Sequence, residues 1–194
     1  MPRDVFLLLG FPGTGKYTVA KALLTELERR GTTTRLVDAH YVNNPIFGLV
    51  HKDGITPLDP KVWLRVEEVR QAMLQTIEEL SPPDWTFVFT NFITENDVKS
   101  KERTAAYVER LSRIASSGGG RFLAIRLICD VDELASRIVG QDRAERMKML
   151  DPHRVRSMVA AETIHDPGNA LTLDITALQP AEAVARILEF AEGS

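Results

Sequence analysis

The sequence of 194 residues is poor in several features that would direct a protein to particular functions. Its one cysteine, Cys129, excludes an internal disulfide and suits a reducing cytosol. A net charge of −3 lacks the basic footprint of nucleic-acid-binding proteins. Apolar runs stay far below the roughly 20 residues of a membrane span, and the N-terminus lacks a signal-peptide pattern. We therefore expect a cytoplasmic protein whose partners include neither nucleic acid nor membrane.

The strongest positive signal lies near the start of the chain, where five apolar residues, Val5–Leu9, run into a glycine-rich turn that ends at Lys16. Such a run is typical of a buried parallel strand. Glycine permits backbone angles that turn N–H groups inward around phosphate oxygens, and the following helix N-terminus and lysine add positive charge. We interpret this stretch as a phosphate-binding loop rather than a chance glycine turn. Its predicted nucleotide-binding residues are Gly10, Gly13, Thr14, Gly15, Lys16, Tyr17 and Thr18.

The loop departs from the strict phosphate-loop pattern at one position, because Tyr17 stands where serine or threonine normally follows the lysine. In the strict motif that hydroxyl ligates Mg²⁺, and a tyrosine is too long to place its oxygen there. The next hydroxyl belongs to Thr18, which we expect to meet a phosphate oxygen or the metal. A carboxylate elsewhere is then needed on the metal side.

A second short strand, predicted over 35–38, ends in the carboxylate of Asp38. Ligands of open α/β sheets bind beyond the carboxyl ends of the strands, so Asp38 is predicted to face the phosphates and to hold Mg²⁺. The alternative is that Asp38 only caps the helix that begins at Ala39.

Strand and helix patterns alternate along the rest of the chain. Further strands are predicted over 85–91, 122–129 and 170–176. The strand over 85–91 ends in Asn91, an uncharged residue where many P-loop proteins place a magnesium-binding aspartate. This alternation predicts one three-layer α/β domain over residues 1–194, with a parallel sheet of five strands and helices on both faces.

The stretch Gly10-x-Pro-Gly-x-Gly-Lys-x-Thr18 resembles the phosphate loop of adenylate kinase-type enzymes. The wider chain is similar to P-loop small-molecule kinases such as shikimate kinase, gluconate kinase and chloramphenicol phosphotransferase. This resemblance implies the strand order 2-3-1-4-5, ATP and Mg²⁺ as cofactors, and a helical acceptor-binding segment over residues 39–81. It implies that Asp38 binds the acceptor, assists Mg²⁺ or takes the acceptor's proton. The residues expected in the acceptor site are Asp38, His40, Asn43 and Asn91, and His40 is open as a base, a ligand or a surface residue.

The resemblance also implies a lid, over residues 137–151, whose arginines swing onto the transferring phosphate. Composition alone supports only a solvated helix face for this basic stretch. Arg137 and Arg143 fit a lid best as catalytic residues. In kinases of the gluconate and shikimate type a C-terminal loop packs on adenine, which implies adenine contacts for Asp174 and Thr176, although capping explains Thr176 equally well.

The favoured function from the sequence is an ATP-dependent phosphotransferase, monomeric or homodimeric, that moves the γ-phosphate to a hydroxyl of a small-molecule acceptor. The Asp-Gly-x-Pro-Arg stretch typical of nucleoside monophosphate kinases is absent after the third strand, which favours a hydroxylated metabolite or antibiotic-like acceptor over a nucleotide. The alternative is an ATP-binding regulatory protein that transfers nothing, which Tyr17 and Asn91 favour. A kinase toxin ranks last, since such toxins usually carry a larger acceptor domain.

Overall fold

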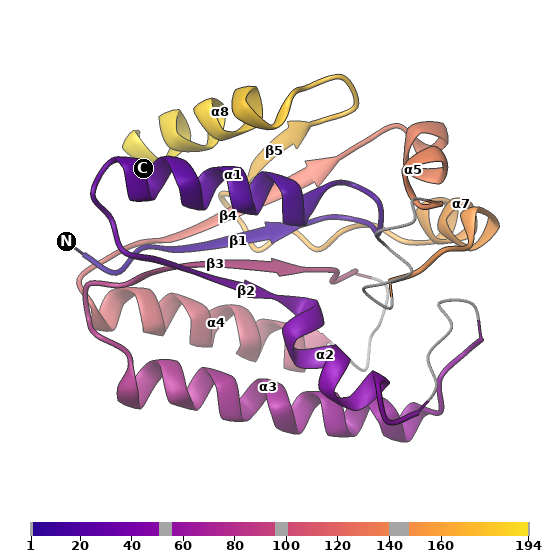
Figure 1. The fold of residues 1–194 in the computed structure, drawn as a ribbon, viewed down its shortest axis with the longest axis horizontal. Coiled ribbons are helices and arrows are strands. Elements are labelled where there is room, and N and C mark those ends of the chain that lie inside the picture. Colours follow the sequence, from indigo (N-terminus) through magenta and orange to yellow (C-terminus); the bar gives the residue numbers. More distant parts are fainter. Residues whose placement is uncertain (1, 51–55, 96–100, 140–147, 194) are drawn as a thin grey trace.

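The computed structural model describes residues 2–50, 56–95, 101–139 and 148–193, and its centre is a parallel sheet (Figure 1). The sheet order is β2-β3-β1-β4-β5, and all four neighbouring pairs are parallel. The predicted sheet and its 2-3-1-4-5 order are therefore confirmed. The strands are β1 (Val5–Leu9), β2 (Thr34–Asp38), β3 (Thr86–Asn91), β4 (Phe122–Ile128) and β5 (Leu171–Asp174).

Helices cover both faces of this sheet, and shorter helices lie near the carboxyl ends of its strands (Figure 1). The first face carries α1 (Lys16–Arg29) and α8 (Pro180–Glu192), and the second carries α3 (Pro60–Leu80) and α4 (Lys101–Ser117). Three shorter helices lie near the carboxyl ends of the strands, namely α2 (Ala39–Phe47), α5 (Val131–Arg137) and α7 (Pro152–Ala161). Ligands of open α/β sheets bind beyond these carboxyl ends, so the three helices surround the expected binding region.

The central strand β1 explains why its sequence is apolar without interruption. Phe6 and Leu8 pack into the core shared with α1 and α8, whereas Leu7 and Leu9 pack into the core shared with α3 and α4. All five residues of β1 are at most 1% exposed. A strand buried on both faces has no polar side to alternate with.

Carboxylates that precede helices determine where three of the helices begin. Asp59, Asp130 and Asp151 each accept hydrogen bonds from backbone N–H groups in the first turn of α3, α5 and α7. Such N-caps satisfy donors that the helix itself leaves unpaired.

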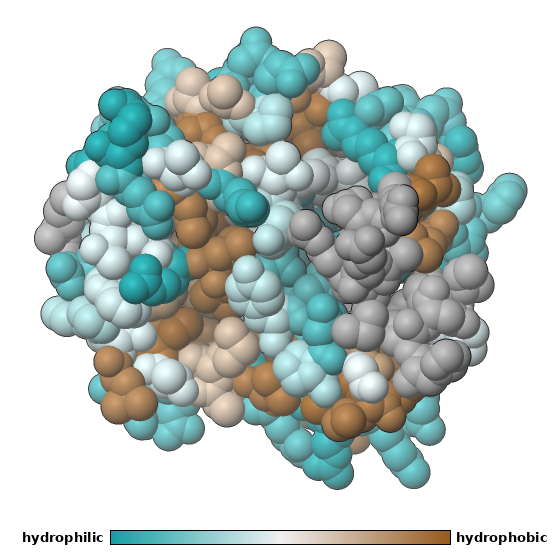
Figure 2. Space-filling model, viewed as in Figure 1, coloured by the Kyte–Doolittle hydropathy of each residue, from teal (hydrophilic) through white to brown (hydrophobic). Residues whose placement is uncertain are grey.

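Two small apolar clusters hold the short helices in position. Val42 and Phe47 of α2 pack on Val62 and Val66 of α3, and a separate cluster joins α5 to α7. On the face drawn in Figure 2, hydrophobic side chains show in a band left of centre and in a smaller group at the lower right, where α2 meets α3, among hydrophilic ones. Within the described ranges, none of the helices combines the length and the hydrophobicity that crossing a bilayer requires.

Candidate functional site

The loop between β1 and α1 takes a conformation that depends on glycine. Gly13 and Gly15 have φ of 95° and 83°, in the left-handed region that residues with a Cβ rarely adopt. A Cβ on Gly13 would also lie 3.1 Å from the backbone oxygen of Leu134, because α5 packs against the loop. The loop backbone is thus shaped both by its own glycines and by a helix more than 100 residues away.

Lys16 lies across this loop and holds its first residues. Its Nζ donates hydrogen bonds to the carbonyl oxygens of Gly10 at 2.7 Å and Phe11 at 2.8 Å. The buried Thr14 hydroxyl donates to Phe11 O at 2.9 Å, so Gly10 and Thr14 stabilise the loop through hydrogen bonds within it. In the described part of the chain no side chain caps the N-terminus of α1. Its first N–H groups and the Lys16 ammonium therefore face the same space, an arrangement that suits an anion.

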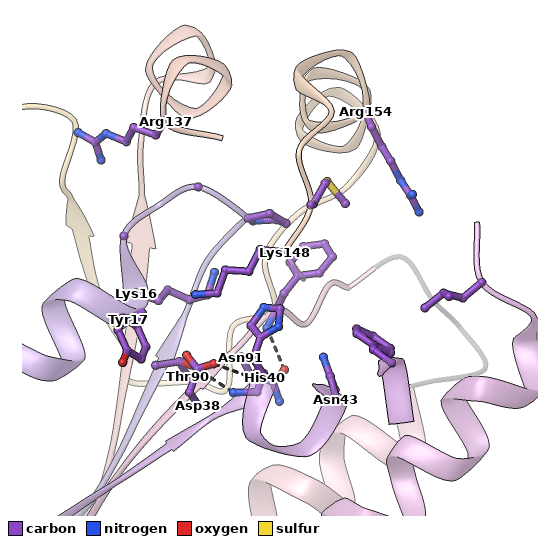
Figure 3. A pocket seen from close by; sticks show the side chains of 18 of the residues that line it. Lys16, Tyr17, Asp38, His40, Asn43, Thr90, Asn91, Arg137, Lys148 and Arg154 are labelled. Carbon is purple, nitrogen blue, oxygen red and sulfur yellow. Dashed lines mark hydrogen bonds between the residues drawn. The ribbon is translucent and has the colours of Figure 1, made fainter. Parts of the chain in front are cut away.

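A cavity of about 690 Å³ opens beside this loop, at the carboxyl ends of β1, β2 and β3 (Figure 3). The cavity brings together most of the predicted site residues from separate elements. Those that line it are Gly13, Gly15, Lys16, Tyr17, Thr18, Asp38, His40, Asn43, Asn91 and Arg137.

Asp38 serves as a helix cap and lines the cavity at the same time. It is 4% exposed; its Oδ1 accepts from His40 N at 2.9 Å, and its Oδ2 accepts from the Thr90 hydroxyl at 2.8 Å. The capping interpretation is therefore confirmed, and the contact of Asp38 with phosphates and Mg²⁺ stays a prediction. The two hydrogen bonds hold the carboxylate in one orientation, and each oxygen keeps a lone pair for a further donor or a cation.

His40 is neutral at pH 7 in this setting. Burial lowers the pKa of His40 to about 4, and the positive charges of Lys148 and Lys16 act in the same direction, against the opposing effects of Asp38 and Asn44. Its Nδ1 lies 3.3 Å from Asn44 Oδ1, which favours the tautomer protonated on Nδ1. The other ring nitrogen can then accept a hydrogen bond from a ligand.

Asn91 is held at the end of β3 by two contacts. Its Oδ1 accepts from Phe92 N at 2.9 Å, and its side chain is hydrogen-bonded to the hydroxyl of Tyr107 on α4. Burial, the main cause, raises the pKa of Tyr107 to about 12, so this hydroxyl keeps its proton. Sequence reasoning did not find Tyr107, because a tyrosine on a helix face is typical of a core residue.

The predicted lid supplies a cation that the sequence did not single out. Arg137 forms an ion pair with Glu133 at 2.7 Å and donates to Thr176 O at 2.9 Å, so its side chain turns toward the loop after β5 (Figure 3). Arg143 lies outside the described residues. Lys148 Nζ instead lies 4.8 Å from the centroid of the Tyr17 ring, over the phosphate loop. The only sequence signal for Lys148 was its membership of the basic stretch.

Asp174 and Thr176 bond to each other rather than lining the cavity. Asp174 Oδ1 accepts from the backbone N–H of Thr176 at 2.9 Å and from its hydroxyl at 2.6 Å. The same hydroxyl accepts from Asp130 N at 2.8 Å, which ties the end of β5 to the start of α5. Their predicted contacts with adenine stay a prediction.

The donors around the cavity fit magnesium held mainly by phosphates. Among the described residues no three His, Cys, Asp or Glu side chains cluster as a metal site. Magnesium in nucleotide sites takes one or two protein carboxylates and keeps phosphate and water ligands, so a dedicated cluster is not needed. Asp38 and Thr18 line the same cavity and suit that mode of binding.

Comparisons with known proteins show which fold this is. No protein-family model matches the chain, and no curated protein matches it either. Among solved structures, a gluconokinase from Sinorhizobium meliloti 1021 superposes with a TM-score of 0.60 at 17% identity, covering 99% of this chain and 95% of its own. A shikimate kinase from Acinetobacter baumannii in complex with shikimate gives 0.58 at 14% identity, with coverage of 100% and 94%.

A third similar structure is Kti12 from Chaetomium thermophilum in complex with ADP-AlF3. It gives a TM-score of 0.59 at 12% identity and covers 96% of this chain and 98% of its own. At identities this low the likeness shows the fold alone. The chain has the fold of P-loop kinases, and the resemblance seen in the phosphate loop is confirmed at that level.

Proposed function

We propose that this protein is an ATP-dependent phosphotransferase that moves the γ-phosphate of ATP to a hydroxyl of a small molecule. The observation that carries the proposal is the shared cavity: a phosphate loop with Lys16 and a fixed carboxylate, Asp38, open into the same space of about 690 Å³. A phosphoryl donor and an acceptor need that juxtaposition, since phosphoryl transfer depends mainly on positioning and charge stabilisation.

The phosphates of ATP bind on the loop backbone from Gly13 to Thr18. Lys16 exchanges its two carbonyl partners in the loop for oxygens of the outer phosphates, because an ammonium binds a phosphate oxygen more strongly than a neutral carbonyl. The first N–H groups of α1 bind the same phosphates. Thr18, at the inner end of this row, meets a phosphate oxygen or the metal.

The transfer itself takes place beside Asp38. The acceptor oxygen forms a bond to the γ-phosphorus while the bond from that phosphorus to the β–γ bridging oxygen breaks, and ADP leaves. The hydroxyl proton passes to the carboxylate of Asp38, which the Thr90 hydroxyl and His40 N hold in place. Neutral His40 accepts a hydrogen bond from the acceptor without competing for the phosphate.

Lys148 neutralises the charge that spreads over the transferring oxygens. Its ammonium group lies over the phosphate loop. The positive charges of Lys148 and Lys16 both lower the pKa of His40, so both lysines lie near that ring. Magnesium, which Asp38 and Thr18 would hold together with the phosphates, supplies further charge neutralisation. Arg137 positions α5 against the loop after β5.

A nucleotide-binding switch that transfers no phosphate is the second candidate. Tyr17 replaces the usual metal-binding hydroxyl and Asn91 the usual carboxylate, and both changes favour slow or absent hydrolysis. The likeness to Kti12 in complex with ADP-AlF3 is compatible with this candidate as well.

Acceptor-dependent ADP release separates the two candidates. Purified protein with ATP and Mg²⁺ is incubated with a panel of small alcohols, and ADP is measured with and without each one. A phosphotransferase releases ADP faster with at least one acceptor and forms one phosphorylated acceptor per ADP. Nucleotide binding with no acceptor-dependent release and no phosphorylated product across the panel would contradict the proposal.

A further inference from the structure

The cavity has a second end, on the side of α2 and α3, whose chemistry differs from that of the phosphate loop. Phe47 of α2 and Trp63 of α3 line it, with ring centroids 5.5 Å apart and ring planes at 88°. Pro57 and Leu58 line it beside them. Edge-to-face contact is a favourable geometry for two aromatic rings, so Phe47 holds the indole in a defined orientation. This end therefore offers a flat apolar surface.

Trp63 leaves much of that surface uncovered. Phe47 is only 3% exposed, whereas Trp63 is 49% exposed although it lines the cavity. Hydrophobic side chains show at the surface in this region, where α2 meets α3 (Figure 2). An apolar ligand that covers the indole removes this surface from water, which favours binding. Leu64, the next residue, is also exposed but does not line the cavity.

Asn43 adds a specific polar requirement. Its Oδ1 is buried and has no hydrogen-bond partner among the described residues, although Asn43 lines the cavity. A buried acceptor without a donor is unfavourable, so a ligand O–H or N–H at this point gains a contact that the protein leaves open. Asn43 follows His40 by three residues on α2, so these two side chains lie about one helical turn apart on the same face of the helix.

Two arginines, Arg70 and Arg154, line the cavity at this end, and Arg70 is paired. Arg70 lines the cavity but forms an ion pair with Glu67 and lies 5.8 Å from the centroid of the Tyr107 ring. Arg154 enters from α7, away from Lys16 in the view of Figure 3. A guanidinium in this place can stack on a ring or meet phosphate oxygens.

We propose that the acceptor is an alcohol carried on a planar, mainly apolar ring. The ring packs on Trp63, an O–H or N–H of the ring system donates to Asn43 Oδ1, and the reacting hydroxyl reaches Asp38. This inference rests on the proposed function and names its substrate class. A pyranose offers the indole only the C–H groups of a puckered, hydroxyl-rich ring, which cover it less completely than a planar apolar ring does.

Fluorescence of Trp63 tests ring binding without any need for turnover. The chain has two tryptophans, Trp63 and Trp85. Trp85 comes just before β3 and does not line the cavity, and the Cζ atom of Arg35 lies 3.9 Å from the centroid of its ring. The variant Trp85→Phe therefore reports on Trp63 alone. With ADP present, we expect 4-hydroxybenzyl alcohol and 4-hydroxyphenylethanol to change its emission saturably, with dissociation constants at least about tenfold lower than those of gluconate and glucose.

Variants then separate the ring contact from the polar contact, with ADP release and calorimetric titration as readouts. Trp63→Ala is expected to raise the KM or dissociation constant of the ring alcohol about tenfold with the KM of ATP unchanged, while Trp63→Phe keeps most of the affinity. Asn43→Leu is expected to weaken ring-alcohol binding about tenfold, and Asn43→Asp, which keeps the acceptor oxygen, less. Leu64→Ala is the matched surface control and should change neither constant.

The possible outcomes separate this proposal from the proposed function. Saturable ring-alcohol binding, with no acceptor-dependent ADP release across the whole panel, contradicts the phosphotransferase and leaves the binding of ring alcohols at Trp63 standing. ADP release with gluconate or glucose but with neither ring alcohol supports the phosphotransferase and overturns the ring-alcohol class. The ring-alcohol class is also overturned if none of the four probes changes the emission of Trp63. Unchanged ring-alcohol binding in both Trp63→Ala and Asn43→Leu would overturn it as well.

Discussion

The two ends of the cavity are built in different ways. The phosphate end is one continuous stretch, residues 10–18, held by its own glycines and by Lys16. The acceptor end is assembled from β2, α2, α3, the end of β3 and the residues before and within α7. A local device of the first kind can be recognised in sequence, although α5 also packs against its Gly13. The second kind depends on packing among several elements, so its residues should be more sensitive to their neighbours.

Removal of the Lys16 charge is expected to give the largest effect and to act only at the phosphate end. Lys16→Ala removes an ammonium from the outer phosphates, and we expect kcat/KM to fall by at least about 10³ and ATP binding to weaken. Nucleotide titration and ADP release measure the two effects. Lys21→Ala, which removes an exposed lysine from the same helix, is the matched control. Nucleotide affinity equal to that of the control would contradict the assignment of Lys16.

Asp38→Asn is expected to separate the two ends. Asparagine caps helices as well as aspartate does, and the Thr90 hydroxyl can accept from the new amide, so the fold and ATP binding should persist. Loss of the base lowers kcat by roughly 10²- to 10³-fold. Steady-state ADP release with saturating substrates measures kcat. Asp38→Ala also loses the cap and should lower the free energy of unfolding by about 1 kcal/mol. Unchanged turnover in Asp38→Asn would remove Asp38 from catalysis.

Variants of Lys148 test whether the predicted lid contributes a catalytic charge between the two ends of the cavity. Lys148→Ala removes the charge over the phosphate loop, and we expect kcat to fall about 10- to 100-fold with ADP affinity little changed. Steady-state kinetics and ADP titration separate these effects. Lys148→Arg should restore most of kcat because the charge returns. If Arg137→Ala lowered kcat about 10- to 100-fold and Lys148→Ala left kcat unchanged, Arg137 rather than Lys148 would be the catalytic cation of the predicted lid.

Tyr107 should give the smallest effect, through Asn91. Tyr107→Phe removes the hydroxyl that is hydrogen-bonded to Asn91, so we expect the free energy of unfolding to fall by about 1 kcal/mol. A looser Asn91 should raise the acceptor KM severalfold with the KM of ATP unchanged. Urea denaturation and steady-state kinetics measure these. Tyr41→Phe, at an exposed position of α2, is the control. An equal rise in both KM values would place Asn91 outside the acceptor end.

Much of the fold could be predicted from the chain because its signals are local. The apolar run of β1, the glycines of the loop and the carboxylates before α3, α5 and α7 each act within a few residues. The order of the strands needed the resemblance, since periodicity says nothing about which strands lie side by side. Predicted strand ends differed by up to two residues, as at β5, where pairing stops at Asp174 rather than Thr176.

The candidate site was predictable only in part, for the same reason. Asp38 was identified by its place at a strand end, but its bond to Thr90 joins residues 52 positions apart. Arg137 matched a lid spacing, yet Glu133 and the Thr176 carbonyl draw its side chain toward the β5 loop. Lys148 looked like any surface lysine until the fold brought it over Tyr17.

The sequence by itself determined that a phosphate loop follows a buried strand, because backbone angles, apolar runs and helix caps depend on neighbouring residues. Only the tertiary structure decided what the loop faces. The packing of α2 on α3 put Trp63 and Asn43 at one end of the cavity, and the packing of α5 on Gly13 shaped the other. Such contacts join residues far apart in the chain, and their geometry follows from the shape of the whole core rather than from any short pattern.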